Sequence, residues 1–176
     1  MNASVLFRIT LLLVFAGYEA IANADAMFSI TRYEFCRNVV DHQPKQPHAD
    51  PAIVKTGETL YLWMEIAVNK AGLRYLKSFG RLPVLVAWGK EGHLVMKPTD
   101  IGIKAEDWSS LKEKILWQYS ASGNSSFKWR TQATRVNLVS GEHYVSVLDP
   151  NRKPVVTEGG GVEAFRPAIN IRVANR

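Results

Sequence analysis

The chain has almost no cysteine and, beyond its first two dozen residues, no long apolar run. Cys36 is the only cysteine among 176 residues, so an intramolecular disulfide is excluded. A chain of this length can bury a sufficient hydrophobic core without one. Cys36 stands in the apolar and aromatic stretch YEFCRNVV, which predicts a small core residue, with a reactive thiol or an intermolecular bridge as the alternative. No later segment offers the roughly 20 apolar residues of a membrane-spanning helix, so we expect a soluble domain.

The common sequence patterns of enzyme active sites are also missing. The sequence contains no G-x-S-x-G, no glycine-rich phosphate loop and no H-E-x-x-H. Paired carboxylates for glycoside hydrolysis meet in space rather than in sequence, so a hydrolase stays open as a third hypothesis. The sequence favours a non-enzymatic protein and predicts no cofactor.

The first residues have the pattern of an export signal. Arg8 precedes an apolar run over Ile9–Tyr18, which is about half the length of a membrane span. Ala22-Asn23-Ala24 follows as an A-x-A cleavage pattern. We expect a signal peptide over residues 1–24 and a single mature domain over residues 25–176, periplasmic or extracellular. An uncleaved anchor is the alternative.

Positive charge exceeds negative charge in this chain. Lys and Arg number 22 against 16 Asp and Glu, a net charge of +6 that removal of residues 1–24 leaves unchanged. Such an excess favours anionic partners. Because an exported protein seldom meets nucleic acid, we expect an envelope protein or an anionic surface component, with peripheral membrane contact left open. The simpler interpretation is a basic surface that only keeps the protein soluble.

Short apolar runs separated by turn residues predict about eight strands, which is typical of an antiparallel immunoglobulin-like β-sandwich. Residues 59–68, TLYLWMEIAV, form the clearest strand, with one uniformly apolar face. VLVAWGKEGHLVM predicts a hairpin, and KILWQYSA, SSFKWRTQATRVNL, HYVSVLD and INIRVA continue the pattern. Two short helices are expected in connections, over residues 69–80 and in AEDWSSLKEK, where Asp107 is a candidate N-cap.

One proline-rich loop gathers the candidate metal ligands. DHQPKQPHAD contains two histidines and two aspartates, the residue types that bind zinc or copper. Their spacing is not that of a preformed site, so we expect no metal, with His42 and His48 as weak candidates.

The stretch FKWRTQATR, residues 127–135, predicts a strand with two different faces. Alternation places Trp129 on the packed side, together with Phe127, Thr131 and Ala133. The outer side then carries the candidate binding residues Lys128, Arg130 and Gln132, together with Thr134. Five tryptophans are many for this length, and in strands such residues are more often core than sugar-stacking platforms.

Glu65 is the fourth candidate binding residue, because it is a carboxylate on a largely apolar strand face. An unpaired carboxylate would be costly if buried, so we expect an arginine partner, and alternation favours Arg130 over Arg135. Two interpretations remain open: an ion pair that pins the sheet, or an anionic-ligand site that uses Lys128 and Arg130.

Several of these segments resemble a bacterial family, the domain of unknown function 2914. The similar segments are RYEFCRNVVDHQP, LYLWMEI with Glu65, VLVAWGKEG, KWRTQATR and GEHYVSVLDPNRKPV, roughly from Arg32 to Val155. The chain departs from the family pattern at Gln132 and Val86 and is longer over residues 70–81. Because no activity is established for the family, the resemblance implies only a fold and an exported or membrane-tethered location.

These observations together predict an exported binding or accessory domain of the cell envelope, which docks on a protein or a membrane complex. An envelope carbohydrate-binding module is the alternative, and an exposed tryptophan pair on one sheet face would favour it. A hydrolase or a metal-binding protein is the third hypothesis, which convergent carboxylates or histidines in a cleft would favour.

Overall fold

Two β-sheets form the body of the molecule in the computed structural model, which describes residues 26–49, 52–90, 93–94, 97–121, 126–158 and 164–172. The first sheet has the strand order β2-β1-β4-β8. Its strands are β1 (Phe28–Val40), β2 (Gln43–Pro47), β4 (Leu60–Val68) and β8 (Phe127–Arg135). All of them pair antiparallel, and β8 lies at the edge.

The second sheet has the strand order β3-β10-β9-β5-β6, and β7 also pairs with β5. Its strands are β3 (Ala52–Lys55), β5 (Leu85–Lys90), β6 (His93–Leu94), β7 (Thr99–Asp100), β9 (Gly141–Leu148) and β10 (Ala168–Arg172). Among the described strand pairs of this sheet, β3 and β10 run parallel and the others run antiparallel. The predicted GKEG hairpin is present as the β5–β6 pairing.

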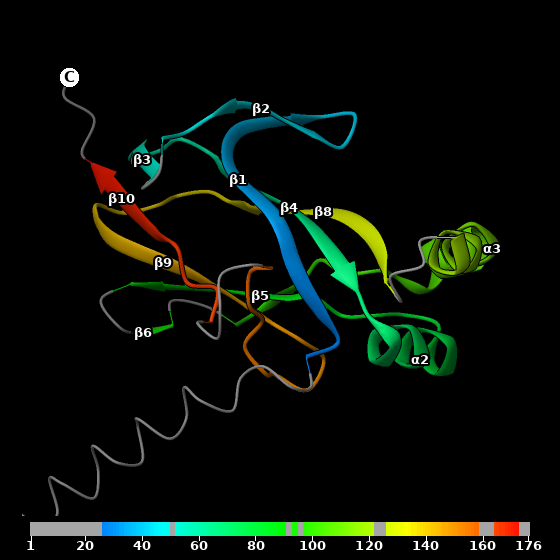
Figure 1. The fold of residues 1–176 in the computed structure, drawn as a ribbon. Coiled ribbons are helices and arrows are strands. Elements are labelled where there is room, and N and C mark those ends of the chain that lie inside the picture. The colour runs from blue at the N-terminus through cyan, green and yellow to red at the C-terminus, as the bar shows by residue number, and fades with distance from the viewer. Residues whose placement is uncertain are drawn as a thin grey trace, which may run out of the picture.

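This strand order is that of an immunoglobulin-like sandwich. β1, β4 and β8 take the places of strands A, B and E, while β10, β9 and β5 take those of G, F and C. After the β1–β2 hairpin the chain crosses to the other sheet, where β3 lies beside the last strand (Figure 1). The predicted fold class is therefore confirmed.

The apolar face of β4 anchors the core between the sheets. Its five inward residues are fully buried: Leu60, Leu62, Met64, Ile66 and Val68. They pack with inward residues of the other sheet, including Val86, Val145 and Val147. Cys36 is buried as expected, and this burial raises the pKa of its thiol despite backbone hydrogen bonds that lower it.

Helix α2 (Lys70–Phe79) follows β4, as the sequence predicts. Asn69 is its N-cap, because its side-chain oxygen accepts hydrogen bonds from the backbone N–H groups of Ala71 and Gly72, at 2.9 and 3.1 Å. Gly80 ends the helix in the left-handed conformation, with φ of 67°.

Helix α3 (Ala105–Ala121) corrects one expectation, since KILWQYSA was predicted as a strand but forms its second half. Apolar residues recur at three- and four-residue steps from Trp108 through Leu111 and Ile115 to Tyr119, and all four pack on the core. This helical period outweighs the β propensity of the individual residues. At 17 residues, α3 is also longer than the short connecting helix that was expected.

The β1–β2 hairpin contains the proline-rich segment, which was predicted as a loop but forms the edge strand β2 in part. Val40 pairs with Gln43, so Asp41 and His42 are the two turn residues, with φ of 51° and 58°. Positive φ at both positions is the geometry of a tight type I′ hairpin turn. The backbone oxygen of His42 accepts a hydrogen bond of 2.8 Å from Trp63 Nε1, so the turn lies over the outer face of β4.

The predicted signal peptide over residues 1–24 falls outside the residues that the structure describes. None of the helices in the described ranges is long and apolar enough to cross a membrane.

Candidate functional site

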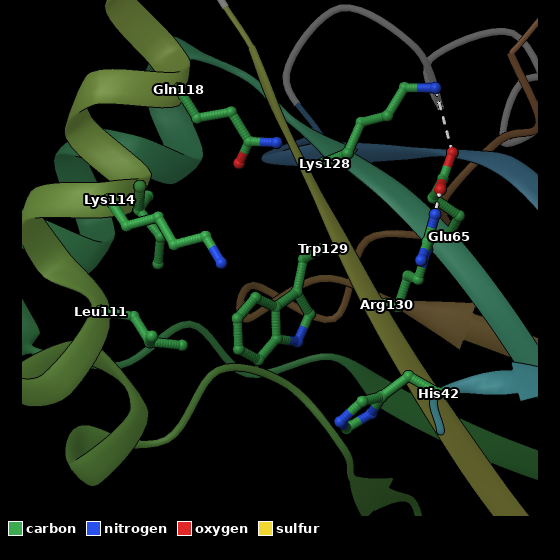
Figure 2. A pocket seen from close by; sticks show the side chains of 9 residues that line it. His42, Glu65, Leu111, Lys114, Gln118, Lys128, Trp129 and Arg130 are labelled. Carbon is green, nitrogen blue, oxygen red and sulfur yellow. Dashed lines mark hydrogen bonds and ion pairs between the residues drawn. The ribbon is translucent and has the colours of Figure 1, made fainter. Parts of the chain in front are cut away.

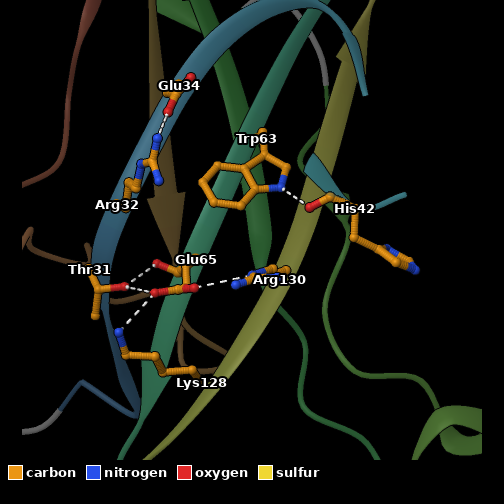
Figure 3. A network of polar contacts seen from close by, with 8 residues as sticks. All are labelled: Thr31, Arg32, Glu34, His42, Trp63, Glu65, Lys128 and Arg130. Atoms are coloured by element: carbon orange, nitrogen blue, oxygen red, sulfur yellow. Dashed lines mark hydrogen bonds and ion pairs between the residues drawn. The ribbon is translucent and has the colours of Figure 1, made fainter. Parts of the chain in front are cut away.

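Glu65 is the centre of a polar network on the outer face of the first sheet (Figure 3). Its carboxylate accepts hydrogen bonds from Lys128 Nζ at 3.0 Å, Arg130 Nε at 3.2 Å and the Thr31 hydroxyl at 3.2 Å. The Glu65 side chain is 13% exposed, whereas those of Lys128 and Arg130 are 61% and 49% exposed. The predicted Glu65–Arg130 contact is thus confirmed, and Lys128 is a second partner.

The ionisation of Glu65 follows from these contacts. Partial burial raises the pKa of its carboxyl, but hydrogen bonds from Lys128, Arg130 and Thr31 outweigh this and hold the pKa below its usual value. Glu65 therefore carries its negative charge at neutral pH, and its two cations are partly neutralised by it.

Trp63 is buried beside this network and is not available as a platform. It is 2% exposed, and the guanidinium carbon of Arg32 lies 5.6 Å from its ring centroid. Arg32 also forms an ion pair with Glu34. The hairpin turn covers the indole from the other side through the bond from Trp63 to the His42 backbone (Figure 3).

A hollow of about 460 Å³ lies between α3 and β8 (Figure 2). Leu111, Lys114 and Gln118 extend from α3 toward β8, and the indole of Trp129 projects between the helix and the strand. The lining continues around the strand to Glu65, Lys128 and Arg130, and it reaches His42 at the hairpin turn.

A second hollow of about 590 Å³ adjoins the first, since both are lined by His42, Trp129 and Arg130. It extends along β8 to Gln132 and along the segment from Asp100 to Asp107 that leads into α3. We call the two hollows together the α3–β8 groove. It follows β8 over residues 128–132, with α3 and the segment before it as the opposite wall.

Charge is unevenly distributed along the α3–β8 groove. At the end lined by the second half of α3, Lys114, Lys128 and Arg130 outnumber the single carboxylate of Glu65. The other end is lined by the carboxylates of Asp41, Asp100 and Asp107, together with the cations of Lys104 and Arg130. Two of the three already accept backbone hydrogen bonds, Asp100 from Val84 and Gly102, and Asp107 from Lys104.

The structure brings together three of the four candidate binding residues. Glu65, Lys128 and Arg130 are in direct contact, and Gln132 lies farther along the same outer face of β8. Trp129 is on the inward side as predicted but only half-buried, because the groove exposes one part of its ring.

Sequence reasoning missed the contribution of α3 to this site. Gln118 was assigned to a strand, and Lys114 to the end of the predicted short helix and the start of that strand, so no relation to Trp129 was expected. The helical period through Leu111 and Ile115 was the signal that could have placed them opposite β8.

The two weak metal candidates, His42 and His48, have different positions and contacts in the fold. His42 is a turn residue at the groove, whereas His48 follows β2 and its backbone N–H donates to Phe35 O at 2.7 Å. Burial, followed by the charge of Arg37, lowers the pKa of His48. Within the described ranges, which omit Asp50, no three side chains of His, Cys, Asp or Glu gather to hold a metal ion.

The tryptophans do not form a sugar-stacking face in the part of the chain that the structure describes. Trp63 and Trp88 are each 2% exposed, and Trp108 and Trp129 are partly buried. Trp117 is 70% exposed, but it lies on α3 rather than on a sheet. The exposed pair that would favour a carbohydrate-binding module is therefore not observed among these residues.

Comparison with known proteins gives no family. No family model matches the chain, and no curated protein matches it either. The resemblance to the domain of unknown function 2914 thus stays a prediction.

Among solved structures, an alkylpurine DNA glycosylase of Pseudomonas fluorescens, AlkC, bound to DNA with an abasic site analog, aligns at a TM-score of 0.41 and 13% identity. The alignment covers 84% of this chain but only 31% of the glycosylase. A CARDB domain from Pyrococcus furiosus, in complex with di-metal ions, aligns at a TM-score of 0.40 and 8% identity, over 87% of this chain and all of that one. The solution structure of that CARDB domain aligns at a TM-score of 0.37 and 8% identity, over 84% of this chain and 97% of that one. Likeness at this level carries no argument about function.

Proposed function

We propose that this protein is a non-enzymatic binding domain of the cell envelope, and that its ligand site is the α3–β8 groove. The observation that carries the proposal is the local charge. Three cations, Lys114, Lys128 and Arg130, line one end of the groove against one carboxylate. The Glu65 carboxylate is already satisfied by its own partners, so an anionic group of a ligand would meet a net positive field.

The dimensions and lining of the groove agree with a ligand site. A hollow of about 460 Å³ that combines an indole, aliphatic side chains and a few charged groups has the composition of a binding pocket. Trp129 and Leu111 supply apolar surface, while Lys114 and Gln118 supply hydrogen-bond donors at the same wall. A ligand with an anionic group and an apolar part fits this arrangement.

The envelope location is part of the proposal and comes from the sequence. An A-x-A pattern after a short apolar run supports export, and a net charge of +6 supports an anionic partner outside the cell. Docking on an envelope protein, rather than on sugar, is supported by the burial of Trp63 and Trp88.

Three anionic probes test the proposal: poly-L-glutamate, alginate and phosphatidylglycerol vesicles, each measured by biolayer interferometry at low ionic strength. We expect at least one to bind, and a Lys114→Glu, Lys128→Glu variant to bind it about tenfold more weakly. A Lys55→Glu, Lys70→Glu variant is the matched control, because both lysines are exposed and lie outside the groove. Absence of binding to all three probes, or equal losses in the two variants, would contradict the proposal.

A further inference from the structure

In the part of the chain that the structure describes, the edge of β8 that faces α3 carries no neighbouring strand. β8 is nine residues long and stands at the end of the first sheet, paired only with β4 in the described topology. In an antiparallel edge strand, alternate residues direct their N–H and C=O groups away from the sheet. Among the described residues, no loop or helix backbone hydrogen-bonds to the backbone of residues 127–134.

The opposite edge of the same sheet is blocked by proline, whereas the edge of β8 is not. β2 contains Pro44 and Pro47, and proline removes the N–H group that an added strand would need. β8 contains no proline, and it pairs with β4 without a register shift from Phe127 to Arg135. A long regular edge of this kind is a template for strand addition.

The α3–β8 groove runs along this edge, and its length sets the size of an occupant. The groove follows residues 128–132, which in an extended strand is about 16 Å, or about five residues of a peptide laid alongside. Trp129 and Leu111 lie on one side of the edge and Arg130 on the other, so alternate side chains of a guest strand would meet different surfaces (Figure 2).

We propose that the ligand of the groove is an extended acidic peptide segment of a partner protein, which adds to β8 as a further strand of the first sheet. The inference rests on the proposed function and names its ligand. Charge selects an acidic segment, because Lys114, Lys128 and Arg130 stand at one end of the groove. A second copy of this chain would bring its own Lys128 and Arg130 to these residues, and like charges across paired strands are destabilising.

A random heptapeptide library displayed on phage, selected on the full mature protein, tests the inference. We expect enriched peptides with acidic residues at one end and β-branched residues between. In synthetic versions, N-methylation of alternate amides should weaken binding by about tenfold or more, because those N–H groups would face β8. N-methylation of the intervening amides should have little effect on binding.

Two variants of the protein separate strand addition from binding elsewhere. Gln118→Trp fills the groove from α3 and should abolish peptide binding, whereas Ser120→Trp, on the same helix but outside the groove, should not. Equal far-ultraviolet circular dichroism of both variants controls for folding.

Several outcomes would overturn the inference. They are no enrichment, equal sensitivity to N-methylation at every amide, equal binding by the two tryptophan variants, and a concentration-dependent dimer that Gln118→Trp dissolves. If alginate or vesicles bind through Lys114 and Lys128 while no peptide does, the proposed function stands and this inference fails.

Discussion

The register of two neighbouring strands explains why Glu65 has two cationic partners. Glu65 is directly opposite Arg130 in the β4–β8 pairing, and Lys128 is the diagonal neighbour two residues away. Both side chains lie on the outer face and reach the carboxylate from either side. Because the carboxylate is mostly buried and its partners are half-exposed, the energy of the network falls between that of a surface pair and a shielded one.

A double-mutant cycle with Glu65→Gln and Arg130→Gln measures this coupling. We expect Glu65→Gln alone to reduce the free energy of unfolding by about 1–2 kcal/mol, and the two residues to be coupled by about 1 kcal/mol. Urea unfolding at low ionic strength provides the measurement. If the effects of the two substitutions on the free energy of unfolding add within experimental error, the contact between Glu65 and Arg130 contributes nothing to stability.

The stabilisation by Glu65 should depend on pH. The pKa of its carboxyl is lower in the folded protein than the ordinary value of 4.5, so the unfolded chain takes up the proton first as the pH falls. The stability that Glu65 contributes is therefore complete above about pH 5 and is lost as the pH falls through the folded pKa. The difference in unfolding free energy between wild type and Glu65→Gln should shrink below pH 4.5; a constant difference down to pH 3 would contradict this.

At the scale of elements, α2 shows how close packing can outweigh the higher helix propensity of alanine over glycine. Gly72 lies inside α2 and is buried against the start of β1 and the end of β4. A Cβ atom there would overlap the backbone oxygen of Met27 and lie 2.7 Å from Val68 Cγ1. The backbone oxygen cannot move aside as a flexible side chain can. The steric cost of a Cβ atom therefore determines whether a substitution at Gly72 raises or lowers the stability.

Gly72→Ala should therefore destabilise the protein, although alanine gains about 1 kcal/mol over glycine in an exposed helix. Overpacking typically costs about 1–3 kcal/mol, so we expect a net loss of about 1 kcal/mol or more. Ser78→Ala, at an exposed position of the same helix, is the control and should stabilise slightly. Thermal unfolding measures both variants; a Gly72→Ala protein that melts higher than wild type would show that Met27 is not held where the structure places it.

At the scale of the whole molecule, both helices lie in connections between the two sheets, and α3 lies beside the β8 edge of the first sheet. α2 joins β4 to β5, and α3 precedes β8, the strand whose edge it faces (Figure 1). The β1–β2 hairpin bends over the outer face from the other side and places His42 at the groove. The groove therefore exists only because two connections, the β1–β2 turn and the segment that contains α3, converge on β8.

Export of the whole chain is a prediction that the structure does not test, because residues 1–25 are not described. We expect the mature protein to begin at Asp25, since cleavage follows the A-x-A pattern. Intact-mass spectrometry of the protein recovered from the envelope fraction measures this directly. Recovery there with an intact Met1 would instead indicate an uncleaved anchor.

The sequence by itself determined the fold class, the core face of β4, helix α2 and the two faces of β8. Each of these features follows from a local period of apolar residues or from capping and turn residues, which act over a few positions of the chain. Alternation also selected Arg130 as the partner of Glu65. The helical period of α3 was also present in the sequence, although KILWQYSA was predicted as a strand. Only the tertiary structure decided that Trp63 is covered by the hairpin turn and that Lys114 and Gln118 face Trp129. These depend on how connections distant in sequence pack against one sheet edge, and no local period records that packing.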